Sequence, residues 1–224
     1  MCYAFCYHDV PLYINANEMN VRRMIFMEDK KILLEGLKND SMSCERCGLC
    51  RGRHNVVFGV GNPEAEVMFI GEGPGEQEDL KGEPFVGKAG ILLDKMLTAI
   101  DLDRNKNIYI ANIVKCRPPQ NRDPQPEEQE LCIAWLRRQF AIIRPKIIVC
   151  LGRIAAARII KPDIRIKREH GQIFNKGGVI MMPVLHPAAL LRNPSDKPGA
   201  FEDFLRLQQL INENCEHTYE DQSK

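Results

Sequence analysis

The chain has 224 residues, 44% of them hydrophobic, and its 31 Lys and Arg residues leave a net charge of +1 against 30 Asp and Glu residues. A chain of this size can bury one good core, which favours a single domain or at most two. No run of about 18 uncharged apolar residues is present, which excludes a bilayer-spanning helix. The first residues lack the basic start, apolar centre and cleavage site of a signal peptide, so a cytoplasmic protein is expected.

Residues 1–26 show neither helical nor strand periodicity and are predicted to be a poorly structured extension. An amphipathic helix is predicted from Glu28 and opens a single domain that covers residues 27–214, with an acidic tail at 215–224. Within the domain, short apolar strands alternate with longer helices. The strands are predicted at residues 67–71, 107–114, 146–152 and 178–186, and the helices at 87–100, 127–143, 153–160 and 201–213.

This alternation is typical of an α/β protein with a parallel sheet that helices cover on both faces. In such sheets, ligands bind beyond the carboxyl ends of the strands. Three polar, Pro-rich loops follow predicted strands, at residues 71–79, 112–124 and 185–194. The sequence therefore predicts that these loops meet at one edge of the sheet and form a site.

The nine cysteines are many for a cytoplasmic chain, where metal binding explains cysteine better than disulfides do. Cys44 and Cys47 are spaced C-x2-C, and Cys116 and Cys132 form a second, wider pair. Four thiolates can hold either a tetrahedral zinc ion or a 4Fe-4S cluster, and the spacing alone fits both. Cys50 adds a further alternative, since Cys47 and Cys50 are also spaced C-x2-C.

Two segments resemble nucleotide-binding motifs, but each lacks a residue that its motif requires. Residues 82–89 approach the phosphate-binding loop, but Ala89 stands where a magnesium-binding hydroxyl is needed. The sequence GEGPGE places Glu76 where the dinucleotide fingerprint has its third glycine. The loop at 71–79 also carries four acidic residues, which makes it a poor cradle for phosphate.

Five segments together resemble the family 4 uracil-DNA glycosylases, the iron-sulfur branch of their superfamily, over residues 44–204. They are CERCGLCRGR, VVFGVGNPEAEVMFIGEGPGEQED, GEPFVGKAG, NIVKCRPPQNRDP and VLHPAALLRNPS. The resemblance implies a three-layer α/β/α sandwich around a short, mostly parallel sheet. It also implies a structural 4Fe-4S cluster on Cys44, Cys47, Cys116 and Cys132, and a monofunctional hydrolase of base excision repair that removes uracil from DNA.

The resemblance also implies roles for residues of the three loops, because such an enzyme flips a nucleotide into a pocket and reads its edge. Glu72 would stabilise positive charge on the sugar and orient water, and His186 would stabilise the departing uracil. Asn112 would read the uracil edge, and Phe85 would stack on its ring. Three further residues are expected to shape the pocket: Gly71 and Gly73 by their small size, and Glu78 by crowding the 5-methyl group of thymine.

Contact with DNA is expected from the loop after the last strand, where Leu190 and Leu191 would wedge into the base stack and Arg192 would hold phosphate. Ala189 departs from the family pattern, which often has tyrosine there. Other basic residues are expected to contact phosphates: Lys115, Arg117, Arg122, Arg165, Lys167 and Arg168. The partner is therefore uracil-containing DNA, bound by a monomer. The alternative is a catalytically silent iron-sulfur module that binds nucleic acid or transfers electrons.

Overall fold

The structure is a computed structural model that describes residues 16–219. At its centre lies a six-stranded sheet in the order β1-β3-β2-β4-β6-β5. The four inner strands are parallel, and each edge strand is antiparallel to its neighbour. The strands are β1 Val60–Gly61, β2 Val67–Gly71, β3 Ile108–Asn112, β4 Ile147–Leu151, β5 Phe174–Lys176 and β6 Val179–Val184. The predicted α/β class is thus confirmed.

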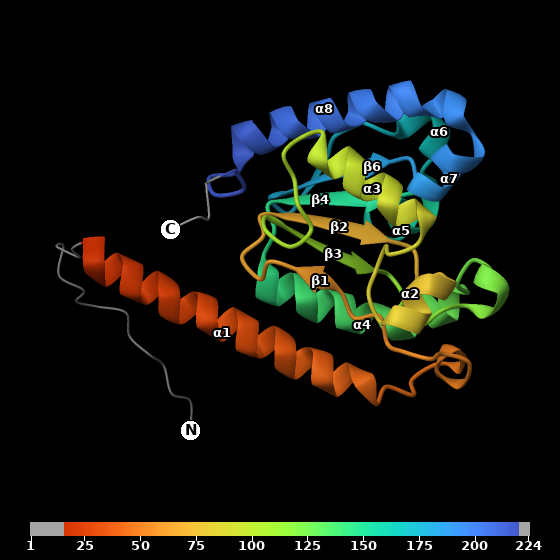
Figure 1. The fold of residues 1–224 in the computed structure, drawn as a ribbon, viewed down its shortest axis with the longest axis horizontal. Helices are drawn as coiled ribbons and strands as arrows, with labels where there is room; N and C mark the ends of the chain where they lie inside the picture. The colour runs from red at the N-terminus through yellow and green to blue at the C-terminus, as the bar shows by residue number, and fades with distance from the viewer. Residues whose placement is uncertain (1–15, 220–224) are drawn as a thin grey trace.

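Helices cover both faces of the sheet, which gives the three layers seen in Figure 1. The longer ones are α1 Ala16–Met42, α3 Lys88–Thr98, α4 Pro126–Ile143 and α8 Lys197–Asn214. The shorter ones are α2 Glu76–Lys81, α5 Arg153–Ile159, α6 Ile166–Glu169, α7 Pro187–Arg192 and the 3-10 turns η1 Gly48–Arg51, η2 Pro119–Asn121 and η3 Pro194–Asp196. Among the described residues, no helix has both the length and the apolar composition of a membrane span.

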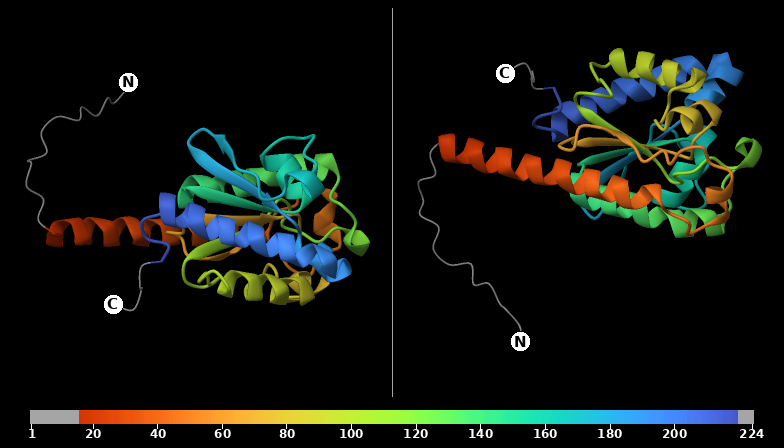
Figure 2. Two further views of the ribbon diagram at one scale, coloured as in Figure 1. Left: turned by 90° about the horizontal axis from the view of Figure 1, so that it is seen from above. Right: turned by 60° about the horizontal axis from the view of Figure 1, so that its bottom comes forward.

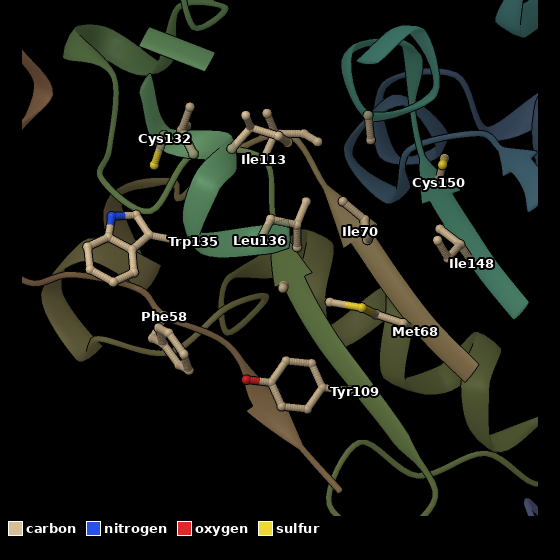
Figure 3. Close-up of a cluster of buried hydrophobic side chains, with 14 of the residues drawn as sticks. Phe58, Met68, Ile70, Tyr109, Ile113, Cys132, Trp135, Leu136, Ile148 and Cys150 are labelled. Carbon is tan, nitrogen blue, oxygen red and sulfur yellow. The ribbon is translucent and has the colours of Figure 1, made fainter. Parts of the chain in front are cut away.

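The central strands are buried along their whole length and are apolar except for Asn112 at the end of β3, because both of their faces are covered. Along β2, Val67 and Phe69 point to one core, which α3 and α8 complete. Met68 and Ile70 point to the opposite core, which contains residues of α1, α4 and α5 and is drawn in Figure 3. The side-chain period of two along a strand thus divides the hydrophobic residues between two layers of helices.

The N-terminal boundary differs from the prediction. The expected extension over residues 1–26 overlaps α1, which begins at Ala16, while residues 1–15 lie outside the described part of the chain. No Gly or Pro occurs from residue 16 to residue 35, so nothing in the backbone stops the helix from extending towards the N-terminus. Figure 1 and Figure 2 show the first turns of α1 projecting beyond the sandwich, which explains why they carry no core-facing periodicity.

The predicted acidic tail, residues 215–224, is held against the domain over its first part. The carboxylate of Glu66, which lies just before β2, accepts hydrogen bonds from the backbone N–H groups of Glu216 (3.0 Å) and His217 (2.7 Å) and from the Thr218 hydroxyl (3.0 Å). Lys146 Nζ lies 2.9 Å from the same carboxylate. Burial alone would raise the pKa of Glu66, but these hydrogen bonds lower it to about 2.

The Glu66→Gln variant is expected to lose about 1–3 kcal/mol of the free energy of unfolding at neutral pH, because the amide cannot accept all of these bonds. The lowered pKa means that Glu66 stabilises the fold fully above its ordinary value of 4.5 and that this contribution is lost as the pH falls towards 2. Denaturant unfolding from pH 7 to pH 2.5 measures this. Glu202→Gln, on an exposed position of α8, serves as the control. A Glu66→Gln deficit that does not shrink at acidic pH would contradict the assignment.

Candidate active site

A cavity of about 480 Å³ lies beyond the carboxyl ends of the parallel strands. All three loops that were predicted to meet line it, and a fourth loop, after β4, completes the wall. The sequence-predicted residues that line the cavity are Glu72, Gly73, Glu78, Phe85, Asn112, Arg122, Lys167, His186 and Arg192. Residues that are 114 positions apart in the chain, such as Glu72 and His186, therefore share one site.

Asn112 ends β3 and pairs in register with Gly71 at the end of β2. Its side chain is buried, and no described residue donates a hydrogen bond to its Oδ1. A β-carbon at Gly71 would lie 2.4 Å from Asn112 Oδ1 and 2.6 Å from Phe85 Cζ, so only glycine fits between them. Because buried polar atoms are normally paired, Asn112 Oδ1 is an acceptor available to a ligand.

His186 and Phe85 form the adjoining wall, with ring centroids 5.7 Å apart and planes tilted by 33°. His186 is the N-cap of α7, and its Nδ1 accepts a hydrogen bond from the Ala188 N–H at 3.1 Å. Burial, and then the positive charge of Arg192, lower the pKa of His186 to about 4. The imidazole is therefore neutral at pH 7, and since Nδ1 is the acceptor, its proton is on Nε2.

Glu72 directly follows β2 and lines the cavity. Burial raises its pKa to about 7, the negative charge of Asp123 adds to the increase, and Arg153 opposes it. Asp123 and Arg153 themselves form an ion pair on the cavity wall. Near neutral pH, Glu72 thus exists in both its acid and its carboxylate form.

Glu78 lines the cavity but is also bound to the protein. Its Oε1 accepts hydrogen bonds from the backbone N–H groups of Val86 (2.9 Å) and Gly87 (2.8 Å), at the start of α3. The expectation that Glu78 crowds a 5-methyl group remains a prediction. What the contacts establish is that Glu78 holds the loop that carries Phe85.

The residues of α7 that were expected to contact DNA do not all face the same way. Leu190 is 1% exposed and packs with Leu185 and Ala200, so it faces the core and is not available as a wedge. Leu191 is 42% exposed, and Arg192 lines the cavity without a carboxylate partner among the described residues. Successive residues of a helix point in different directions, so the two leucines could not both face DNA.

Lys115, expected at a phosphate, is instead 1% exposed. Its Nζ donates hydrogen bonds to the Asn112 carbonyl (3.0 Å) and to Gln139 Oε1 (2.6 Å). Its backbone N–H donates to Cys132 Sγ at 3.2 Å. Lys115 is therefore an internal link between the strand end that carries Asn112 and the cysteine-rich region.

The sequence analysis missed the wall after β4, where Gly152 and Arg153 line the cavity. Gly152 has φ of 88°, a left-handed conformation that glycine adopts without strain, and a β-carbon there would lie 2.9 Å from His186 Cβ. The signal was present, because this glycine directly follows a buried strand whose carboxyl end points to the same edge. The pattern of residues 153–160 by itself predicts only a covering helix.

All five cysteines that were considered as ligands, Cys44, Cys47, Cys50, Cys116 and Cys132, line a second, small pocket between the start of the domain and α4. N–H groups donate to three of their sulfurs. Trp135 Nε1 lies 3.3 Å from Cys44 Sγ and Arg53 Nη1 lies 3.5 Å from Cys116 Sγ, in addition to the Lys115 contact. Figure 3 shows Cys132 and Trp135 side by side at the edge of the core.

N–H donors of this kind stabilise metal-bound thiolates, whereas burial alone raises the pKa of Cys47, Cys116 and Cys132. In the described part of the chain, no three Cys, His, Asp or Glu side chains are grouped as ligands of a single ion. The pocket brings together enough thiol side chains to supply the four ligands of either group, zinc or a 4Fe-4S cluster.

The sequence model of the uracil DNA glycosylase superfamily matches residues 58–208, and this match places the chain in a class of DNA repair enzymes. The chain belongs to the type-4 uracil-DNA glycosylase family of that superfamily. It is 46% identical to the type-4 uracil-DNA glycosylase of Archaeoglobus fulgidus, over 79% of this chain and 92% of the relative. It is 43% identical to that of Sulfurisphaera tokodaii, over 79% and 84%, and 42% identical to that of Thermotoga maritima, over 76% and 90%.

Proposed function

We propose that this chain is a monofunctional uracil-DNA glycosylase of base excision repair, which flips deoxyuridine out of DNA and hydrolyses its N-glycosidic bond. The products are free uracil and an abasic site. The observation that carries this proposal is one cavity with an unpaired buried acceptor, Asn112 Oδ1, and a neutral imidazole donor, His186 Nε2–H, beside the Phe85 ring.

The edge of uracil matches these groups. Its N3–H can donate to Asn112 Oδ1, and its O4 can accept from the Asn112 amide. Cytosine has an acceptor at N3 and a donor at position 4, so every one of these bonds would be mismatched. A mismatch leaves buried groups unpaired at about 1–3 kcal/mol each, which rejects cytosine. Phe85 stacks on the uracil ring, and Gly71 leaves room for the Phe85 side chain.

The reaction breaks the bond between C1′ and N1, and its electron pair leaves with uracil as an anion. His186 Nε2–H donates to uracil O2 and stabilises that anion without giving up its proton. The carboxylate of Glu72 stabilises the positive charge that develops on the sugar and accepts a proton from the attacking water, whose oxygen bonds to C1′. His186 is already neutral near pH 7, whereas Glu72 has to be in its carboxylate form when water attacks.

DNA binding is assigned to the rim of the cavity. Arg192 neutralises a phosphate, and the exposed Leu191 supplies the wedge, whereas Leu190 only supports α7 from inside. Other rim residues, Arg122, Arg153 and Lys167, form ion pairs with Glu128, Asp123 and Asp196 that a phosphate could replace. A net charge of +1 over the whole chain is compatible with DNA binding, because only this local patch has to face DNA.

The test is base release from oligonucleotides that carry uracil opposite guanine, opposite adenine, or unpaired. The expected result is free uracil and an alkali-labile abasic site, with no strand break before alkali treatment. A purified protein with its cluster intact that binds these oligonucleotides but releases no base would reject the proposal. That result would favour the alternative, a silent iron-sulfur module.

The rate of uracil release is expected to rise with pH between 5 and 8, because Glu72 acts as a carboxylate and its pKa is raised to about 7. His186, with a pKa of about 4, does not titrate in this range. In Glu72→Gln the rate should be low and should lose most of this rise with pH. The raised pKa also means that ionising Glu72 opposes folding as the pH rises from 4.5 through 7, so Glu72→Gln should be more stable than the wild type at pH 8.

Single-turnover rates and thermal unfolding over this pH range measure both effects. The control is Glu76→Gln, an exposed glutamate of the same loop that does not line the cavity. A wild-type rate that falls with rising pH, or a Glu72→Gln profile parallel to the wild type, would contradict the role of Glu72.

The cofactor in this proposal is a 4Fe-4S cluster held by Cys44, Cys47, Cys116 and Cys132, with a structural function. Cys44 and Cys47 precede η1, Cys116 follows β3 and Cys132 lies in α4, so the cluster would join the start of the domain to the loop and helix behind Asn112. Of the two alternative pairs near the N-terminus, Cys44 with Cys47 is favoured, because Cys44 Sγ receives the Trp135 N–H.

Replacing Cys44 with serine is expected to remove most of the iron and to lower the melting temperature, whereas Cys50→Ser should retain iron, visible absorbance and stability. The two cysteines lie in the same segment and line the same pocket, which makes them a matched pair. Iron content, sulfide content and thermal unfolding of protein purified without oxygen provide the measurement. Loss of iron in Cys50→Ser and retention in Cys44→Ser would reverse the assignment.

A monomer in the cytoplasm completes the proposal. The seven cysteines in the described part of the chain are all free of disulfides, as expected of a reducing compartment.

A further inference from the structure

Phe85 has an unusual backbone conformation for a bulky residue. Its φ is 54°, in the left-handed region that residues with a β-carbon rarely adopt. A conformation of this kind persists only where the surrounding structure fixes it, and such residues concentrate at functional sites. The contacts around residues 84–87 show what fixes this one.

Arg104, in the segment between α3 and β3, binds this loop from outside the cavity. Its Nη1 donates to the Pro84 carbonyl at 2.9 Å, and its Nη2 donates to the Phe85 carbonyl at 2.7 Å. Its Nε donates to Asp94 Oδ1 at 2.8 Å, and this bond fixes the orientation of the guanidinium group. The Arg104 side chain is only 10% exposed, so these bonds are largely shielded from water.

The other side of the loop is fixed as well. The Glu78 carboxylate accepts the next two N–H groups, those of Val86 and Gly87. A β-carbon at Gly90 in α3 would lie 1.8 Å from the Phe85 carbonyl oxygen, so α3 packs directly on this backbone. The loop is therefore held by an arginine on one side and a glutamate on the other, with no room to shift towards α3.

We propose that Arg104 is a positioning residue for uracil excision, which sets the angle of the Phe85 ring over the extruded base while lying outside the cavity itself. This inference rests on the proposed function. Arg104 does not line the cavity and does not touch the base, so it acts only through the Phe85 backbone. Without its two hydrogen bonds, the left-handed conformation is held only by Glu78 and by the packing of α3, and the ring can turn away from the base that it should stack on.

The experiment is a double-mutant cycle between Arg104→Met and Phe85→Leu, with single-turnover uracil release as the readout. Methionine keeps the apolar stem of the arginine, and leucine keeps the buried position of Phe85 filled. In the wild-type background, Arg104→Met is expected to slow release by about 10- to 100-fold, which is the range for a misplaced contact. In the Phe85→Leu background, the same change should alter the rate by no more than about twofold, because the ring that it positions is gone.

Arg206→Met provides the matched control. Arg206, on α8, also donates to a backbone carbonyl, that of Gly171 at 2.9 Å, but neither residue lines the cavity, so the change should leave the rate unchanged. If Arg104→Met does not fold, Arg104→Lys replaces it in the cycle, since lysine can still reach one of the two carbonyls. Equal slowing in both Phe85 backgrounds, or no slowing at all, overturns the positioning role. A wild-type protein that releases no uracil instead rejects the proposed function, so the two failures are distinct.

Discussion

Replacing His186 with alanine is expected to slow uracil release by about 100- to 1000-fold, the usual cost of removing one preorganised donor to a developing anion. The magnitude follows from the state of the imidazole. Its Nδ1 is occupied by the Ala188 N–H, and its lowered pKa keeps it neutral, so Nε2–H is a fixed donor that water does not replace. Because the donor acts mainly on the transition state, the rate constant should fall far more than the affinity for DNA.

The same change removes the N-cap of α7, which is worth about 1 kcal/mol, so folding has to be measured separately. His186→Asn is the control for this effect, because an asparagine side chain can still cap the helix but is too short to reach the base. We expect His186→Asn to unfold at nearly the wild-type temperature and to be almost as slow as His186→Ala. A normal rate in either variant would show that the imidazole does not stabilise the leaving group.

The position of the site could be predicted from the sequence because the site follows a general rule of the fold. Polar residues at the end of an apolar strand or directly after it, such as Asn112 and Glu72, converge at one edge of a parallel sheet, whatever their separation in the chain. The α/β class could be predicted for the same reason, since strands buried on both faces have continuous apolar sequences. The position of the site and the fold class thus depend only on the local pattern of apolar and polar residues and on the order of strands and helices.

The contacts that hold the site in place could not be predicted in this way. Arg104 appears in the sequence as one basic residue in a polar loop, and nothing local shows that it binds carbonyl groups 19 and 20 positions earlier. Lys115 stands beside Arg117 and was expected on the surface, yet the Asn112 carbonyl and Gln139 hold it inside. Leu190 and Leu191 differ only by one position in a helix of six residues, which is too short for periodicity to show which one is buried.

Replacing Asn112 is expected to remove the selectivity of the site as well as its activity. Asn112→Leu keeps the size of the side chain but loses two hydrogen bonds to uracil, at about 1–3 kcal/mol each, so uracil release should fall by about 100-fold or more. A site that pairs with a polar edge rejects a mismatched analogue by about 10⁴- to 10⁵-fold, and an apolar wall cannot do so. We therefore expect free uracil to compete with DNA far better than free cytosine in the wild type, and the two bases to compete equally in Asn112→Leu.

The Asn112→Asp variant distinguishes the effect of hydrogen bonding to uracil from the effect of side-chain size. Its carboxylate has nearly the size of the amide but cannot donate to O4 of uracil, so release should be slow at pH 8. As the pH falls, the buried carboxyl takes up a proton and becomes a donor, and part of the lost affinity for uracil should return. The backbone at residue 112 stays in place in both variants, because Lys115 Nζ donates to its carbonyl oxygen and the Gly71 backbone pairs with it in the sheet. Competition by free bases at pH 6 and pH 8 measures each step, and uracil binding by Asn112→Leu within about twofold of the wild type would show that the base is not read at this strand end.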